Sequence, residues 1–177
     1  MSEVHIFGLD HFHQNLETRC ATPAGIADEQ RQKSDLARAL REIIDRNCVE
    51  LIAEEGKLNR LSLGWRVAQE CAIDHIDITM PIEEREKHGV KTPDYDHEET
   101  TRKIAYKIFE QFMFEQAKTH EGQVTLIMCG RRHLAGLAQL FRAAGDDVRP
   151  HDINDYPWYR GIPVEGEDGV TGYRRES

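Results

Sequence analysis

Two Gly-x-x-His motifs contain the residues of this sequence best suited to chemistry. They occupy residues 8–11 (Gly-Leu-Asp-His) and 130–133 (Gly-Arg-Arg-His), and each follows an apolar run that predicts a β-strand. Glycine after a strand lets the chain turn sharply and lets a ligand approach the backbone. A histidine three residues further on can then point back over the end of the strand. We therefore expect His11 and His133 to share one site.

A third strand-like run ends in two carboxylates, Glu54 and Glu55. Ligands of open α/β sheets bind at the carboxyl ends of the strands, so we expect both glutamates to join His11 and His133 there as catalytic residues. One glutamate would be a metal ligand or general base while the other orients a histidine, and the sequence leaves open which does which. The alternative is that the histidines are loop residues and the glutamates form a solvated turn.

Imidazoles combined with carboxylates suit a divalent first-row metal ion such as Mn²⁺, Co²⁺, Ni²⁺ or Zn²⁺. We expect its ligands among His11, His13, Glu54 and His133, with His13 either an extra ligand or a residue that supports one. Three protein ligands and a water molecule would leave a position open for hydrolysis. The pattern therefore favours a metal-dependent hydrolase of ester or amide bonds.

Four further residues are candidates for holding a substrate: Arg131, Arg132, Asp77 and Arg85. The two adjacent arginines open a predicted helix, where backbone N–H groups already favour an anion. Either could hold a carboxylate or phosphate, or stabilise an oxyanion. Asp77 ends a short strand and, with Arg85 just beyond it, could close one side of the pocket. For the arginines, salt bridges to nearby acidic residues are an equal alternative.

The apolar periodicity predicts five strands that alternate with helices. We expect strands at residues 4–8, 49–53, 73–78, 124–129 and 147–151, and helices at 28–47, 61–72, 82–88, 100–120 and 134–144. This order predicts an α/β fold: a mostly parallel central sheet flanked by helices on both faces. Residues 1–177 are expected to form a single domain, on which residues 152–177 pack as an irregular tail or a small hairpin.

Composition excludes several classes of protein. The 32 acidic residues outnumber the 23 basic ones, giving a net charge of -9, which argues against extended binding of nucleic acid. No run approaches the roughly 18 apolar residues of a membrane span, and the first residues do not resemble a signal peptide, so a cytoplasmic protein is expected. The four cysteines are widely spaced and predict free thiols. A homodimer is compatible with the sequence, although no apolar patch marks its interface.

The two Gly-x-x-His motifs, with a strand ending in Glu54 and Glu55 between them, resemble the TraB/Tiki superfamily, which also includes erythromycin-esterase-like and ChaN-like proteins. The order of elements is similar over residues 4–151, but the specific matches are limited to these three motifs. The resemblance implies an α/β fold with His11, Glu54, Glu55 and His133 gathered at one site. It also implies metal-dependent peptidase or esterase activity, although one branch binds haem. This compact chain lacks room for the helical insertions that shape substrate pockets in many members, so the substrate is not implied.

Two function hypotheses follow. The first is a small cytosolic metal-dependent hydrolase acting on a small molecule or peptide. The second is a non-catalytic binding module or sensor for a nucleotide-like or acidic small molecule, in which residues 130–132 hold the anion. A third, an interaction subunit, rests only on the long helix at 100–120. The first hypothesis requires His11, His133 and at least one glutamate to lie within about 4 to 6 Å of a common point, with both histidines partly buried.

Overall fold

A five-stranded, all-parallel sheet forms the centre of the molecule. The structure, a computed structural model, describes residues 2–56, 61–90, 99–166 and 169–175. The strands follow the order β3-β2-β4-β1-β5 across the sheet, with β1 at Glu3–Leu9, β2 at Leu51–Glu54, β3 at Asp74–Asp77, β4 at Thr125–Gly130 and β5 at Asp147–Asp152. This confirms the predicted α/β fold class.

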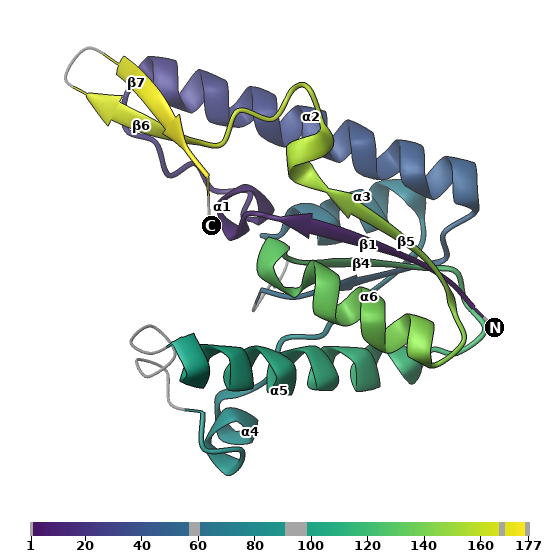
Figure 1. Ribbon diagram of the computed structural model, residues 1–177. Coiled ribbons are helices and arrows are strands. Elements are labelled where there is room, and N and C mark those ends of the chain that lie inside the picture. The colour runs from purple at the N-terminus through teal and green to yellow at the C-terminus, as the bar shows by residue number, and fades with distance from the viewer. Residues whose placement is uncertain (1, 57–60, 91–98, 167–168, 176–177) are drawn as a thin grey trace.

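Helices cover both faces of the sheet (Figure 1). Helices α2 (Pro23–Asn47) and α3 (Leu63–Cys71) lie on one face, whereas α5 (Glu99–Lys118) and α6 (Leu134–Ala143) lie on the other. The short α4 (Ile82–Lys87) follows β3. Helix α2 begins earlier than its apolar pattern predicted, because Thr22 caps its amino terminus and Pro23 occupies the first turn. It ends where Cys48 adopts the left-handed conformation.

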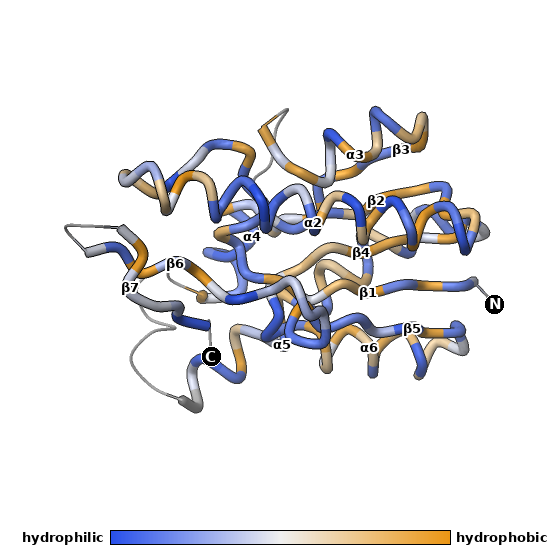
Figure 2. Tube along the Cα trace, turned by 90° about the horizontal axis from the view of Figure 1, so that it is seen from above, coloured by the Kyte–Doolittle hydropathy of each residue, from blue (hydrophilic) through white to orange (hydrophobic). Residues whose placement is uncertain are grey.

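Alternation along the strands separates the core into two layers. Ile6 and Ile127 pack with α5 and α6, whereas Phe7 and Leu126 pack with α2 and α3. All four side chains are fully buried, as the continuous apolar runs of central parallel strands require. The edge strand β5 is more hydrophilic and mostly exposed (Figure 2). The neighbouring strands β1 and β4, which precede the two motifs, therefore sit between both cores.

The segments that follow β1 and β4 are short helical turns. Helix α1 spans His11–Gln14, and the 3-10 helix η2 spans Arg131–His133 directly before α6. Gly8 lets η2 approach β1, because a Cβ at Gly8 would lie 3.2 Å from the Cα of Arg131 and 3.1 Å from the Cβ of Leu134. The glycine of the first motif thus lies at a close contact between β1 and the segment that contains the second motif.

The carboxyl-terminal residues form a hairpin on α2. After the 3-10 helix η3 (Ile153–Asp155), strands β6 (Ile162–Gly166) and β7 (Gly169–Arg174) pair antiparallel. The carboxylate of Glu165 accepts hydrogen bonds from the backbone N–H groups of Ala21 and Thr22, just before α2. Residues 162–166 and 169–174 thus form the small hairpin, one of the two alternatives expected for this region.

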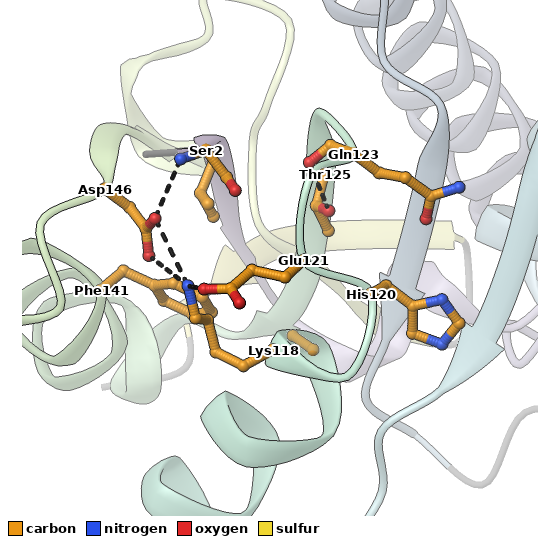
Figure 3. Close-up of a pocket in the computed structure, with 10 residues that line it drawn as sticks. Ser2, Lys118, His120, Glu121, Gln123, Thr125, Phe141 and Asp146 are labelled. Carbon is orange, nitrogen blue, oxygen red and sulfur yellow. Dashed lines mark hydrogen bonds and ion pairs between the residues drawn. The ribbon is translucent and has the colours of Figure 1, made fainter.

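A small polar cluster closes the amino-terminal edge of the sheet (Figure 3). The carboxylate of Asp146 accepts from the backbone N–H of Ser2 at 3.1 Å and pairs with Lys118 Nζ at 3.3 Å. The cavity beside these residues has a volume of only about 10 Å³, which is at the lower limit for one water molecule. This cavity therefore has no space for a substrate.

No helix in the described part of the chain is long and apolar enough to cross a membrane. All four cysteines are free, as their spacing predicted.

Candidate functional site

The three motifs meet because their strands are neighbours. Strand β4 pairs with β1 on one side and with β2 on the other, so Leu9 lies opposite Gly130 and Glu54 lies opposite Met128. All the strands are parallel, and the segments that follow them leave the same edge of the sheet. This is the end at which α1 lies in Figure 1.

His11 presents one defined ring nitrogen to this edge. Its Nδ1 lies 2.5 Å from Oε1 of Gln14, whose own Nε2 donates to the backbone carbonyl of Glu55 at 2.8 Å. Since the amide nitrogen of Gln14 faces a carbonyl, its oxygen must accept from His11, which places a proton on Nδ1. The Nε2 atom of neutral His11 therefore carries a lone pair. A Cβ on Gly130 would lie only 2.8 Å from this Nε2.

His133 is oriented in the same way by a carboxylate. Its Nδ1 lies 3.2 Å from Oε1 of Glu110, a buried residue of α5, and its Nε2 lies 3.8 Å from Oε1 of Glu55. Burial disfavours the charged imidazolium, but the hydrogen bond to Glu110 and the charges of Glu55 and Glu110 outweigh it and raise the pKa of His133. The ring of Tyr106 packs edge-on against His133, with 5.0 Å between ring centroids.

Glu55 lies between the two histidines. Its Oε2 accepts from the backbone N–H of Gly130 at 2.9 Å, and a Cβ on Gly130 would lie 3.6 Å from that oxygen. His11, Glu55 and His133 therefore gather around Gly130, with Gln14 and Glu110 behind the imidazoles. We call these five side chains the Gly130 cluster. The three motifs therefore share one edge of the sheet, where Glu55 accepts from the backbone of Gly130 and lies near His133. The expected partial burial holds for His133 but is wrong for His11, which is exposed.

Glu54 does not belong to the cluster. Side chains alternate along a strand, so Glu54 shares the α3 face with Ile52, whereas the next residue, Glu55, lies on the other side. Its Oε2 accepts from Ser62 Oγ at 2.8 Å and pairs with His75 Nε2 at 2.9 Å, in a fully buried position. The assignment of Glu54 as a metal ligand or catalytic residue at this site is therefore corrected: its contacts are those of a structural carboxylate.

His13 is also placed away from the cluster. The segment after β1 that contains His11 and His13 is the short helix α1, in which residues two positions apart point in nearly opposite directions. The His13 ring is fully buried against Phe12 and Tyr159. Burial lowers its pKa to about 4. The assignment of His13 as a metal ligand is corrected for this reason.

The four residues expected to bind substrate have the following surroundings in the structure. Asp77 is exposed on the edge strand β3, separated from β4 by β2, and accepts from the backbone N–H of Thr79. Arg85 donates to the carbonyl of Met80 and lies over the ring of Phe109. Arg132 donates to the hydroxyl of Tyr106 at 2.8 Å. Arg131 lines a groove on the far side of α6.

Sequence reasoning missed the two residues that orient the histidines. Glu110 had a detectable signal, because it is an acidic residue within the buried apolar face of α5, next to Phe109 and three residues before Met113. Such a charge needs a buried partner. Gln14 had a weaker signal: it follows His11 by three residues, a spacing that brings side chains together only in a helix.

The cluster contains the donor types of a transition-metal site, two imidazole nitrogens and a carboxylate. Within the described residues, however, no group of three or more His, Cys, Asp or Glu side chains is arranged so that it could hold a metal ion. Both Nδ1 atoms are held by oxygen acceptors, as in metal-binding histidines. The Nε2 atom of His133 faces Glu55, and that of His11 lies beside Gly130. The types of donor atom and the orientation of the imidazoles therefore suit a metal ion. The spacing of the three side chains in this structure does not suit one.

Comparison with known proteins adds no assignment. No family model matches the chain, and neither a curated protein nor a solved structure matches it. The resemblance to the TraB/Tiki superfamily thus rests on the three short motifs alone.

Proposed function

We propose that this chain is a small hydrolase of ester or amide bonds that uses a divalent transition metal held by His11, His133 and Glu55. The observation that supports the proposal most is the matched orientation of the two imidazoles. Each has its Nδ1 on an oxygen acceptor. The Nε2 atom of His133 faces Glu55, and that of His11 lies beside Gly130. The resemblance to the TraB/Tiki superfamily suggests the same chemistry.

A metal ion held by these residues would require the Glu55 carboxylate to turn from its present contacts. The backbone of Gly130 holds only one oxygen of Glu55, by a hydrogen bond of 2.9 Å, and the other oxygen lies 3.8 Å from His133 Nε2. Turning the Glu55 carboxylate breaks one hydrogen bond, whose net contribution to stability is typically about 1 kcal/mol. Metal coordination would outweigh that loss.

The side chains of the site would have two roles: some would bind the metal ion, and others orient the histidines. A divalent ion bound here would lower the pKa of a water molecule and polarise a carbonyl oxygen. Gln14 and Glu110 act through the histidines: each fixes a ring and its tautomer, and the negative charge of Glu110 makes the His133 ring more basic. Gly130 lets His11 Nε2 approach the backbone closely, because a Cβ at this position would lie only 2.8 Å from that nitrogen.

Hydrolysis of two model substrates tests the proposal. The chain, purified without chelator, would be assayed with p-nitrophenyl acetate and with an alanine p-nitroanilide, in EDTA and with added Mn²⁺, Co²⁺, Ni²⁺ or Zn²⁺. We expect at least one metal to stimulate one substrate, and we expect Glu55→Gln to abolish that stimulation. The matched control is Glu42→Gln, which changes an exposed glutamate of α2. Stimulation that persists in both His11→Ala and His133→Ala, or none with any metal and either substrate, would contradict the proposal.

A further inference from the structure

A second candidate site lies on the other side of α6 from the Gly130 cluster. A groove of about 510 Å³ runs between α6 and the edge strand β5. Its apolar wall includes Leu134 and Ala138 of the helix and Pro150 of the strand. This volume falls within the range of roughly 300 to 1,000 Å³ that is usual for small-molecule sites.

The helical period separates this groove from the proposed hydrolase site. His133, Leu137 and Phe141 are buried on the side of α6 that faces the core and α5. The residues at 131, 134, 138 and 142 recur at intervals of three or four, so they form a different stripe, and this stripe lines the groove. A ligand in the groove would therefore contact residues that the Gly130 cluster does not use.

Positive charge is concentrated around this groove. Arg131, Arg132 and Arg142 line it together with one acidic residue, Asp152, although the whole chain carries a net charge of -9. In the described part of the chain, neither Arg131 nor Arg142 has a hydrogen bond or ion pair for its guanidinium, whereas Arg132 donates to Tyr106. Asp152 is engaged with the backbone N–H and side-chain amide of Asn154. The groove thus keeps a net positive charge with two uncommitted guanidinium groups.

The two uncommitted arginines lie at opposite ends of the apolar wall. Residues 131 and 142 are separated by eleven positions, or roughly 16 Å along a helix axis. An elongated apolar molecule with a terminal carboxylate would cover Leu134 and Pro150 and place its charge at one of these ends. We propose that the groove binds a medium-chain carboxylate or a molecule of that class. The assignment is independent of the proposed hydrolase, because it involves no bond cleavage and none of the cluster residues.

Octanoate and its neutral counterpart 1-octanol are the probes that test this assignment. Titration into ¹⁵N-labelled protein should shift amide resonances of α6 and β5 with octanoate, and 1-octanol should bind on the order of tenfold more weakly, since the charged hydrogen bonds are lost. Arg131→Ala combined with Arg142→Ala should weaken octanoate binding by a similar factor. Arg46→Ala, at an exposed position of α2, is the matched control and should not weaken it. His11→Ala should also bind octanoate normally.

Four results would overturn the assignment. Octanoate could bind the double variant as tightly as the wild type, or shift resonances only outside α6 and β5. Equal binding of 1-octanol would remove the role of charge. A dimer that dissociates on Arg142→Ala, detected by sedimentation at the NMR concentration, would show that a second copy of the chain covers the groove instead. Circular dichroism of each variant checks that the fold is retained.

Discussion

Replacing Gly130 with alanine should weaken metal binding at the proposed site while leaving the free energy of unfolding nearly unchanged. The backbone of Gly130 has φ -55° and ψ 134°, a conformation open to any residue, so alanine introduces no backbone strain. Its Cβ would lie 2.8 Å from Nε2 and 3.3 Å from Cε1 of His11. Both atoms belong to the far end of an exposed side chain, which can move away. The substitution therefore displaces His11 and leaves the sheet intact.

The expected change in stability is small because two effects oppose each other. Glycine-to-alanine substitution at a compatible position stabilises by about 0.4 to 1 kcal/mol through the unfolded state. Pushing His11 off its preferred rotamer costs about 0.5 to 1.5 kcal/mol. We expect urea titration to find a free energy of unfolding within about 1 kcal/mol of the wild type. Metal affinity, measured by isothermal titration calorimetry, should fall at least about tenfold. Mutations that disturb the orientation of a metal ligand typically have an effect of this size.

The other motif glycine provides the contrast. A Cβ on Gly8 would meet the backbone Cα of Arg131 and the Cβ of Leu134, neither of which can rotate away, so Gly8→Ala should destabilise by about 1 to 3 kcal/mol. Gly172→Ala, where nothing lies within 4 Å of the added Cβ, is the neutral control. Metal affinity that is unchanged in Gly130→Ala would refute this reasoning about His11.

Three further predictions concern residues outside the proposed site. Burial lowers the pKa of His13 and of His151 to about 4. Histidine in the unfolded chain titrates near 6.5, so the unfolded chain binds protons at a higher pH than the folded chain does. The free energy of unfolding should therefore fall as the pH is lowered from about 6.5 to 4, by up to roughly 3 kcal/mol for His13 alone. Urea titrations at several pH values check this, and His13→Phe should reduce the slope. Glu54→Ala removes the partner of Ser62 and His75 and should destabilise by about 1 to 3 kcal/mol in thermal melts without changing metal affinity. Asp146→Ala removes the acceptor of Ser2 and Lys118 and should lower the melting temperature while leaving hydrolysis unchanged.

The sequence predicted the fold well because its strands are continuous apolar runs. Strand β4 and the stretch before it contain no charged residue from 124 to 130, and burial on both faces leaves little ambiguity about such a segment. Helix α5 was recognisable from the stripe that contains Ala105, Phe109 and Met113, all of which are buried. Its exact start was less certain, as it is for most helices.

The composition of the site was harder to predict, because it depends on side-chain direction. Glu54 and Glu55 have the same residue type and adjacent positions, but the alternation of β2 sends them to opposite faces. His13 was misplaced because α1 is only four residues long, too short to show a helical period in the sequence. The contacts of Glu110 with His133 and of Gln14 with Glu55 cross long separations in the chain, and no local pattern specifies them.

Direct titration of the purified chain with Mn²⁺, Co²⁺, Ni²⁺ and Zn²⁺, followed by isothermal calorimetry, tests the central claim most directly. The proposal predicts one ion bound per chain for at least one of these metals. It also predicts that His11→Ala, Glu55→Gln and His133→Ala each weaken that binding by at least about tenfold, whereas Glu42→Gln does not. Absence of binding for all four metals, or binding that survives all three cluster substitutions unchanged, would contradict the assignment of the Gly130 cluster as a metal-dependent hydrolase site.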